Sequence, residues 1–193
     1  MKLLINLILF TSVLVSCTGQ SKTETSSEDS LTTNQETITN TPAPKSPRTA
    51  STATIDGNQI QIDYSSPSVR GRQIFGGLVG YGEVWVTGAH KATSIQFDNA
   101  VVIEGKVIPA GKYGLFTIPM EGQWTIILNE KWDMHLADEY DSNYDILRIN
   151  RPIEPLPNKV ESLTFSIDVV SDGKAQISIA WDKTKVKFEL TNS

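Results

Sequence analysis

The feature that most constrains the fold is a series of short segments, alternating between apolar and polar residues, that begins near Thr54 and ends near Leu190. Turn signals such as Asp56-Gly57-Asn58, Glu104-Gly105 and Ser171-Asp172-Gly173 separate these segments. A period of two is typical of strands with one buried face, and such turn residues are typical of tight hairpins. About ten short strands at this spacing predict an all-β domain, an antiparallel β-sandwich that is jelly-roll-like.

The same pattern gives expectations about particular segments. Val84–Val86 is expected to form a short strand, and Asp182-Lys183 is expected to be a turn within the C-terminal meander. Pro67–Phe75 and Glu130–Tyr140 are expected to be helical or irregular. Ile126–Leu128 is a continuous apolar run, which is consistent with a strand covered on both faces.

The N-terminus, residues 1–16, has the pattern of a secretory signal peptide. Met1-Lys2 is positively charged, and Leu3–Val15 is apolar but shorter than the roughly 20 residues that span a membrane. The run ends in Leu14-Val15-Ser16-Cys17, which resembles the lipobox of bacterial lipoproteins. The resemblance implies cleavage before Cys17 and acylation of that residue, and several acyl chains together anchor a protein stably in a membrane.

The residue after Cys17 is Thr18, not an aspartate. In the envelope sorting systems of lipoproteins this implies the outer membrane, here facing the periplasm. Residues 17–52 are rich in Ser, Thr and Pro and lack aromatic residues, so they are expected to be a disordered tether that precedes a domain at 53–193. The formal net charge of −5 argues against nucleic acid as a partner.

A glycine-rich stretch from Tyr64 to Phe97 contains the first candidate site residues, Arg70 and Arg72. Two guanidiniums can bind a carboxylate, sulfate or phosphate through planar pairs of donors. The alternative, which the sequence favours, is that they pair with acids such as Asp63 or Glu83 and hold the loop to the sandwich.

Other candidate residues are two histidines, a lysine and two tryptophans near loops. His90 and His135 are the only histidines, and they lack the HxH or HExxH spacing of a metal site, so neither a metal nor a cofactor is predicted. The single cysteine also excludes an intramolecular disulfide. Lys91 is next to His90. Trp85 has the polar neighbours Thr87 and His90, and Trp132 has Asp133 and His135, so these rings could stack on a sugar or peptide.

Several motifs together look like the DUF2911 family, which is found mostly in Bacteroidota, often as secreted or lipid-anchored proteins. The motifs are Tyr64-x-x-Pro67-Ser-Val-Arg-Gly-Arg72, Ile74-Phe-Gly-Gly-Leu-Val79, Val84-Trp85-x-Thr-Gly-Ala89, Pro109-Ala-Gly-Lys-Tyr113, Leu115-Phe-Thr-Ile-Pro119, Trp124-Thr-Ile-Ile-Leu-Asn129 and Asp145-x-Leu-Arg148. The resemblance covers nearly all of residues 53–190 and implies fold and location but no chemistry. The family pattern W-R-T-G-A-N-E-A-T is altered here at Val86, His90 and Lys91.

These features predict a non-enzymatic lipoprotein of the cell envelope with a ligand-binding or scaffolding β-sandwich. Its partners would be the membrane, through the lipid on Cys17, and a glycan, a small anion or an envelope protein. The residues expected to face the ligand are Arg70, Arg72, Trp85, His90, Lys91, Trp132 and His135. The alternatives are a periplasmic hydrolase of a glycan or small anionic substrate, with His90 or His135 as its base, and a purely structural part of an envelope complex.

Overall fold

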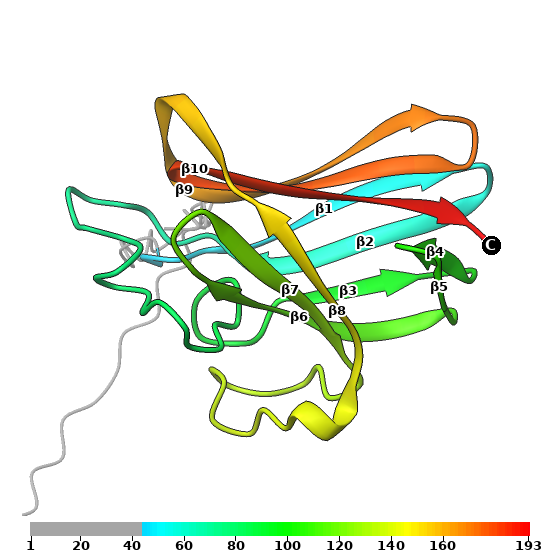
Figure 1. Cartoon of the computed structure of the whole chain (residues 1–193), viewed down its shortest axis with the longest axis horizontal. Coiled ribbons are helices and arrows are strands. Elements are labelled where there is room, and N and C mark those ends of the chain that lie inside the picture. The colour runs from blue at the N-terminus through cyan, green and yellow to red at the C-terminus, as the bar shows by residue number, and fades with distance from the viewer. Residues whose placement is uncertain (1–43) are drawn as a thin grey trace, which may run out of the picture. The chain divides into compact units, whose positions relative to one another are not determined.

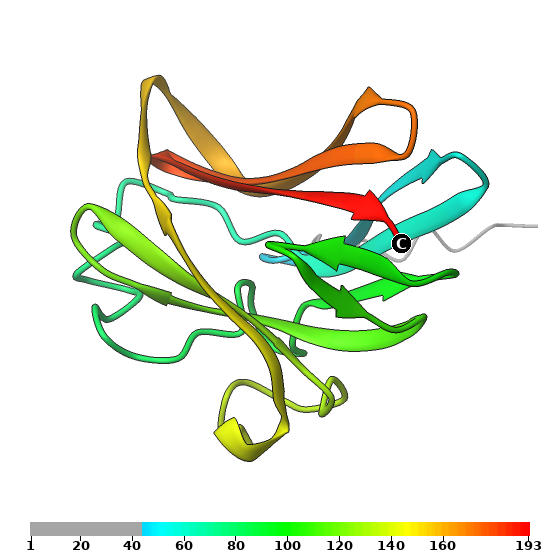
Figure 2. The ribbon, with the colours of Figure 1, turned by 45° about the vertical axis from the view of Figure 1, so that its right-hand side comes forward.

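The computed structural model describes residues 44–193, in which ten β-strands form two antiparallel sheets in a sandwich-like arrangement (Figures 1 and 2). The predicted all-β, antiparallel fold is confirmed. Among these residues the only helical element is a 3-10 turn, η1 (Ser142–Tyr144), and no helix has the length and hydropathy of a membrane span. The predicted signal peptide, Cys17 and most of the predicted tether lie outside the described residues.

The larger sheet has six strands in the order β1-β2-β3-β6-β7-β8. These strands are β1 (Arg48–Ile55), β2 (Asn58–Ser65), β3 (Ser94–Phe97), β6 (Gly111–Pro119), β7 (Gln123–Asn129) and β8 (Asp145–Pro152). The smaller sheet has four strands in the order β5-β4-β10-β9. They are β4 (Val101–Ile103), β5 (Lys106–Ile108), β9 (Glu154–Ser171) and β10 (Lys174–Asn192).

The predicted tight turns are present where two neighbouring residues both adopt positive φ. Asp56 and Gly57 (φ 44° and 77°) connect β1 to β2, and Glu104 and Gly105 (φ 50° and 75°) connect β4 to β5. Positive φ at both central residues gives the turn a twist that matches the right-handed twist of the paired strands. The turn residues therefore fix the register of both hairpins.

Two expectations about strands are wrong. Asp182-Lys183 does not form a turn, because β10 continues through it and shifts register against β9 on either side of Asp182, whose φ is 53°. A bulge of this kind bends a strand and strengthens its twist without ending it. Val84–Val86 is not a strand: Trp85 forms only one isolated bridge, to Thr117 of β6.

The sequence analysis ended the tether at residue 52 and began the domain at residue 53, but the first strand begins before that residue. Residues 48–52 belong to β1, which pairs with β2 from Arg48 opposite Ser65 to Ile55 opposite Asn58. β1 is an edge strand whose first side chains are exposed. Few of its residues therefore need to be apolar, and the sequence lacks the alternation that marks the other strands. Backbone pairing, which a composition argument does not detect, orders this segment.

The main core lies between the two sheets. Its largest fully buried side chains include Trp124 of β7 and Trp181 of β10. A second cluster, formed by Val86, Ala92, Phe116, Ile127 and Met134, lies on the other face of β6 and β7. The prediction that Ile126–Leu128 is covered on both faces is therefore confirmed.

Two long loops provide the cover on that other face. They are loop 66–93, between β2 and β3, and loop 130–144, between β7 and β8. Figure 1 shows loop 130–144 on the side of the larger sheet away from β9 and β10. All residues of both clusters belong to the compact unit Thr41–Ser193, which therefore has its own hydrophobic core, as a domain that folds independently requires.

Candidate ligand-binding cleft

A cleft of about 460 Å³ opens between loop 66–93, loop 130–144 and the residues that precede β1. Volumes in this range are typical of sites for small molecules. Its lining consists of Lys45, Ser46, Pro67, Arg70, Arg72, Leu78, Val79, Trp85, Val86, Gly88, Ala89, His90, Leu136 and Trp181. Four of these residues are basic or a histidine (Lys45, Arg70, Arg72 and His90), and none is acidic.

The guanidinium groups of Arg70 and Arg72 are held by backbone carbonyl groups. Arg70 Nη2 donates to the Lys45 carbonyl at 2.8 Å. Arg72 donates from Nε to the Val69 carbonyl at 3.1 Å and from Nη2 to the Ser68 carbonyl at 2.7 Å. Because a guanidinium has five N–H donors, both groups keep donors that these bonds do not use.

The expectation that the two arginines pair with acids is wrong. Within residues 44–193 neither side chain forms an ion pair with a carboxylate. Asp63, one of the expected partners, lies 3.8 Å from Lys112 instead. The carboxylate of Glu161 accepts a hydrogen bond from the backbone nitrogen of Arg70, at 2.8 Å, and not from its guanidinium. Both arginines therefore present their charge at the cleft.

Aromatic side chains form the floor of the cleft. The rings of Trp85 and Trp181 are stacked, with centroids 5.7 Å apart and an interplanar angle of 17°. Phe75 packs against both of them at centroid distances of 6.1 Å. Trp124 packs against Trp85 at 6.1 Å and against Phe75 at 4.8 Å. Trp85 Nε1 donates to the Gly88 carbonyl at 3.0 Å, whereas the buried Trp181 Nε1 has no hydrogen-bond partner among the described residues.

The backbone around the cleft adopts conformations that are rare for residues other than glycine. Four residues other than glycine have positive φ there: Arg70 (50°), Thr87 (51°), His90 (61°) and Leu136 (52°). Thr87 is the most unusual of them, because positive φ is a genuine outlier for a β-branched residue. Such strain persists only where surrounding contacts enforce it, and it is concentrated at functional sites.

Specific hydrogen bonds hold these strained residues in place. Thr93 Oγ1 donates to the Thr87 carbonyl at 2.9 Å, and the hydroxyl groups of Thr87 and Thr117 lie 3.1 Å apart. The Leu136 backbone nitrogen donates to the His90 carbonyl at 2.7 Å, which joins the two loops at the edge of the cleft. These hydrogen bonds therefore fix the backbone of the cleft walls.

The two histidines, which are distant in sequence, lie close together. Their ring centroids are 6.4 Å apart, and Lys91 and His135 form an isolated bridge between the loops. Only His90 lines the cleft. In the described part of the chain, no hydrogen bond joins either imidazole to a carboxylate, and no three metal-ligating side chains are grouped together.

The remaining candidate residues lie beside the cleft and not in it. Lys91 pairs with Asp133 at 2.7 Å. Trp132 lies beneath Lys112 Nζ, which is 4.3 Å from its ring centroid, and Lys91 Nζ lies at 5.9 Å. A tryptophan occupied by two ammonium groups is engaged in cation–π contacts and is not a free stacking surface.

Arg70, Arg72, Trp85 and His90 thus line the cleft, whereas Lys91, Trp132 and His135 do not. Sequence reasoning missed Lys45, because it was assigned to the tether. Its assignment of Trp181 to the core is correct, although this residue also borders the cleft. Leu78 and Leu136 carried no signal in the sequence. Val86, one of the departures from the family pattern, lies in the cleft wall.

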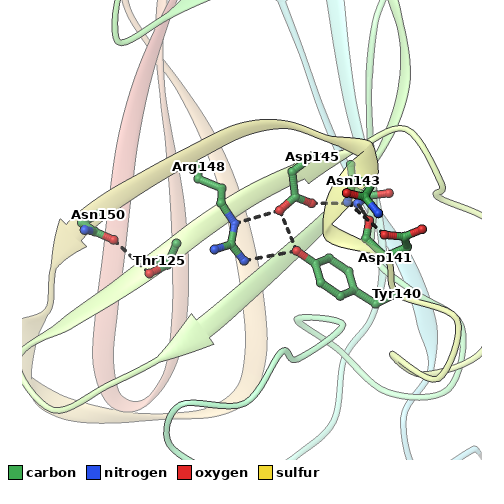
Figure 3. A network of polar contacts seen from close by, with 8 residues as sticks. Thr125, Tyr140, Asp141, Asn143, Asp145, Arg148 and Asn150 are labelled. Carbon is green, nitrogen blue, oxygen red and sulfur yellow. Dashed lines mark hydrogen bonds and ion pairs between the residues drawn. The ribbon is translucent and has the colours of Figure 1, made fainter.

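A polar network fixes the end of loop 130–144 (Figure 3). The same loop contributes Leu136 to the cleft. The centre of the network is the carboxylate of Asp145, with 6% of its side chain exposed. Asp145 accepts hydrogen bonds from Tyr140 Oη at 2.6 Å, Arg148 Nε at 2.7 Å and Asn129 Nδ2 at 2.7 Å. Burial, together with the bond to this carboxylate, raises the pKa of Tyr140 above its ordinary value, so its hydroxyl stays protonated and remains a donor.

The comparisons with known proteins concern the domain that carries this cleft. A family model described as "Protein of unknown function (DUF2911)" matches residues 46–190. No curated protein and no solved structure matches the chain. The matched range begins two residues before β1 and so includes the strand that the sequence analysis assigned to the tether.

Proposed function

Because the chain belongs to the DUF2911 family, whose description names no activity, we propose its function from the cleft: the β-domain is a binding module for a small anion. The observation that carries the proposal is the pair of guanidinium groups of Arg70 and Arg72, which line the cleft without an ion-paired carboxylate among the described residues. Arginine at such a position offers charge-assisted hydrogen bonds to a carboxylate, sulfate or phosphate.

The charge of the other lining residues supports the same function. Lys45 and His90 add basic groups, and no aspartate or glutamate lines the cleft to compete with a bound anion. The protein as a whole is acidic, with a formal net charge of −5, so the basic cleft differs in sign from the molecule around it. Anion binding would therefore be local to the cleft and would weaken as salt screens the exposed charges.

Loss of one cleft arginine should weaken anion binding strongly. With residues 41–193, we expect Arg70→Ala or Arg72→Ala to raise the Kd for phosphate, sulfate or acetate by about tenfold or more, because a hydrogen bond to a charged group contributes about 1.5–3 kcal/mol. Isothermal titration calorimetry measures this change. Arg151→Ala is the matched control, since Arg151 pairs with Glu104 and does not line the cleft. An equal loss in Arg151→Ala, or no binding of any anion, would overturn the proposal.

The proposal also places this module at the cell envelope. Cys17 carries the lipid, and the Ser/Thr/Pro-rich segment after it serves as a tether at the outer membrane, facing the periplasm. The lipobox-like Leu14-Val15-Ser16-Cys17 supports this assignment. Cells grown with an alkyne analogue of palmitate should label the chain, and Cys17→Ala should abolish the label. Persistent labelling of Cys17→Ala would count against lipidation at this residue.

A further inference from the structure

Behind its basic groups the cleft is lined by apolar side chains. Pro67, Val79 and Val86 are buried in its wall, and the stacked Trp85 and Trp181 form its floor. An inorganic anion bound at the arginines would leave the accessible part of this apolar surface, chiefly the half-buried Trp85, in contact with water. The hydrophobic effect favours a ligand that covers the surface and removes it from water.

Two leucines extend the apolar surface to the outer edge of the cleft. Leu78, from loop 66–93, is 50% exposed, and Leu136, from loop 130–144, is 41% exposed. Large apolar side chains that are exposed together at one site indicate a binding surface more than isolated ones do. A hydrated glycan would not match the chemistry of these leucines, whereas a hydrocarbon chain would.

Together these features lead us to infer that the bound anion carries an apolar chain, and that the ligand class is a free, single-chain organic anion such as an alkyl carboxylate. The inference rests on the proposed function, because it assigns a ligand class to the same cleft. The carboxylate would accept hydrogen bonds from Arg70 and Arg72, and the chain would lie against the tryptophan floor and the two leucines. The cleft of about 460 Å³ has the volume of a small-molecule site. A stable protein partner would instead need about 1,000 Å² or more of buried surface.

The decisive experiment is a chain-length series of linear carboxylates, from acetate to decanoate, titrated into residues 41–193 below their micelle-forming concentrations. We expect the Kd to fall about three- to fourfold for each added methylene until the cleft is filled, which is the usual gain for a buried methylene. The matched primary alcohols should bind at least about tenfold more weakly, because they lack the charge that the arginines recognise.

Variants separate the two parts of the ligand. Arg70→Ala should weaken the whole series by a common factor, whereas Leu78→Ser should reduce the gain per methylene and so weaken decanoate binding more than acetate binding. Val107→Ser is the control for Leu78→Ser, because Val107 is 55% exposed on β5 and does not line the cleft. Both serine substitutions are at exposed positions, so they should not impair folding.

The unfavourable outcomes are distinguishable. A Kd that stays constant from acetate to decanoate, yet rises in Arg70→Ala, would overturn the inference that the ligand carries an apolar chain. It would leave the proposed anion binding intact. Equal binding of carboxylates and alcohols, with no effect of Arg70→Ala, would overturn both. A third outcome is arginine-dependent binding to vesicles that contain phosphatidylglycerol, without binding of the free carboxylates. It would show that the anion is a membrane lipid and would overturn the inference that the ligand is a free, single-chain anion.

Discussion

Trp124→Ala is expected to lower the free energy of unfolding by about 3–5 kcal/mol, the usual cost of truncating a fully buried large aromatic residue to alanine. Trp124 is 1% exposed and belongs to the main core between the sheets. Its ring contacts Phe75 at 4.8 Å and Trp85 at 6.1 Å, measured between centroids. The ring lies in the main core, to which both sheets and loop 66–93 contribute, so we expect the cavity left by the indole not to collapse completely. Urea denaturation followed by far-ultraviolet circular dichroism measures the change.

Trp132→Ala is the matched control for this prediction. Trp132 is only half-buried, and it makes cation–π contacts with Lys112 and Lys91. Such contacts contribute about 0.5–1 kcal/mol at exposed sites, so Trp132→Ala should be much less destabilising than Trp124→Ala. Equal losses in the two variants would show that Trp124 is not a central residue of the core.

Asp145→Ala is expected to lower the free energy of unfolding by about 2–4 kcal/mol, because hydrogen bonds to charged groups contribute about 1.5–3 kcal/mol and unpaired buried donors add a further cost. The substitution leaves Tyr140, Arg148 and Asn129 without their common acceptor. In this variant, loop 130–144 should exchange its amide hydrogens faster than it does in the unchanged protein, whereas exchange in the strands should change less. Hydrogen-exchange mass spectrometry measures both rates.

Asp141→Ala tests the same loop with a smaller perturbation. The Asp141 carboxylate caps η1 and accepts one hydrogen bond, from the Asn143 backbone nitrogen at 2.9 Å. Loss of a cap of this kind costs about 1 kcal/mol. If Asp145→Ala were no more destabilising than Asp141→Ala, the buried carboxylate would not be the centre of the network.

The fold was predictable from the sequence because the strands and hairpin turns carry local signals. Asp56-Gly57 and Glu104-Gly105 have residues that tolerate positive φ, and the alternating segments between turns show which side chains are buried. β1 escaped prediction because it is a polar edge strand held by backbone bonds. The bulge at Asp182 escaped because Asp-Lys after an apolar strand is also a good turn signal.

The site was predictable only in part, because a cleft depends on which loops meet in space. Arg70, Arg72, Trp85 and His90 share one sequence stretch, and they also share the cleft. Leu136 reaches the same cleft from a loop more than 40 residues later, and no periodicity marks it. The hydrogen-bond partners of the arginines could not be predicted from the sequence either. They are backbone carbonyl groups, which are present at every residue and carry no compositional signal.

The cover on both faces of β6 and β7 has a consequence for how these strands find their alignment. Where one face of a strand meets water, a slip by one residue exposes every apolar side chain, and this penalty fixes the alignment. In β6, Leu115 and Phe116 are both fully buried, on opposite faces, so a slip would exchange one apolar side chain for another. The alignment must then depend on the residues of β6 that are not large and apolar. Gly114 leaves room for the ring of Phe116 and the Lys131 carbonyl, and the Thr117 hydroxyl finds its partner in Thr87.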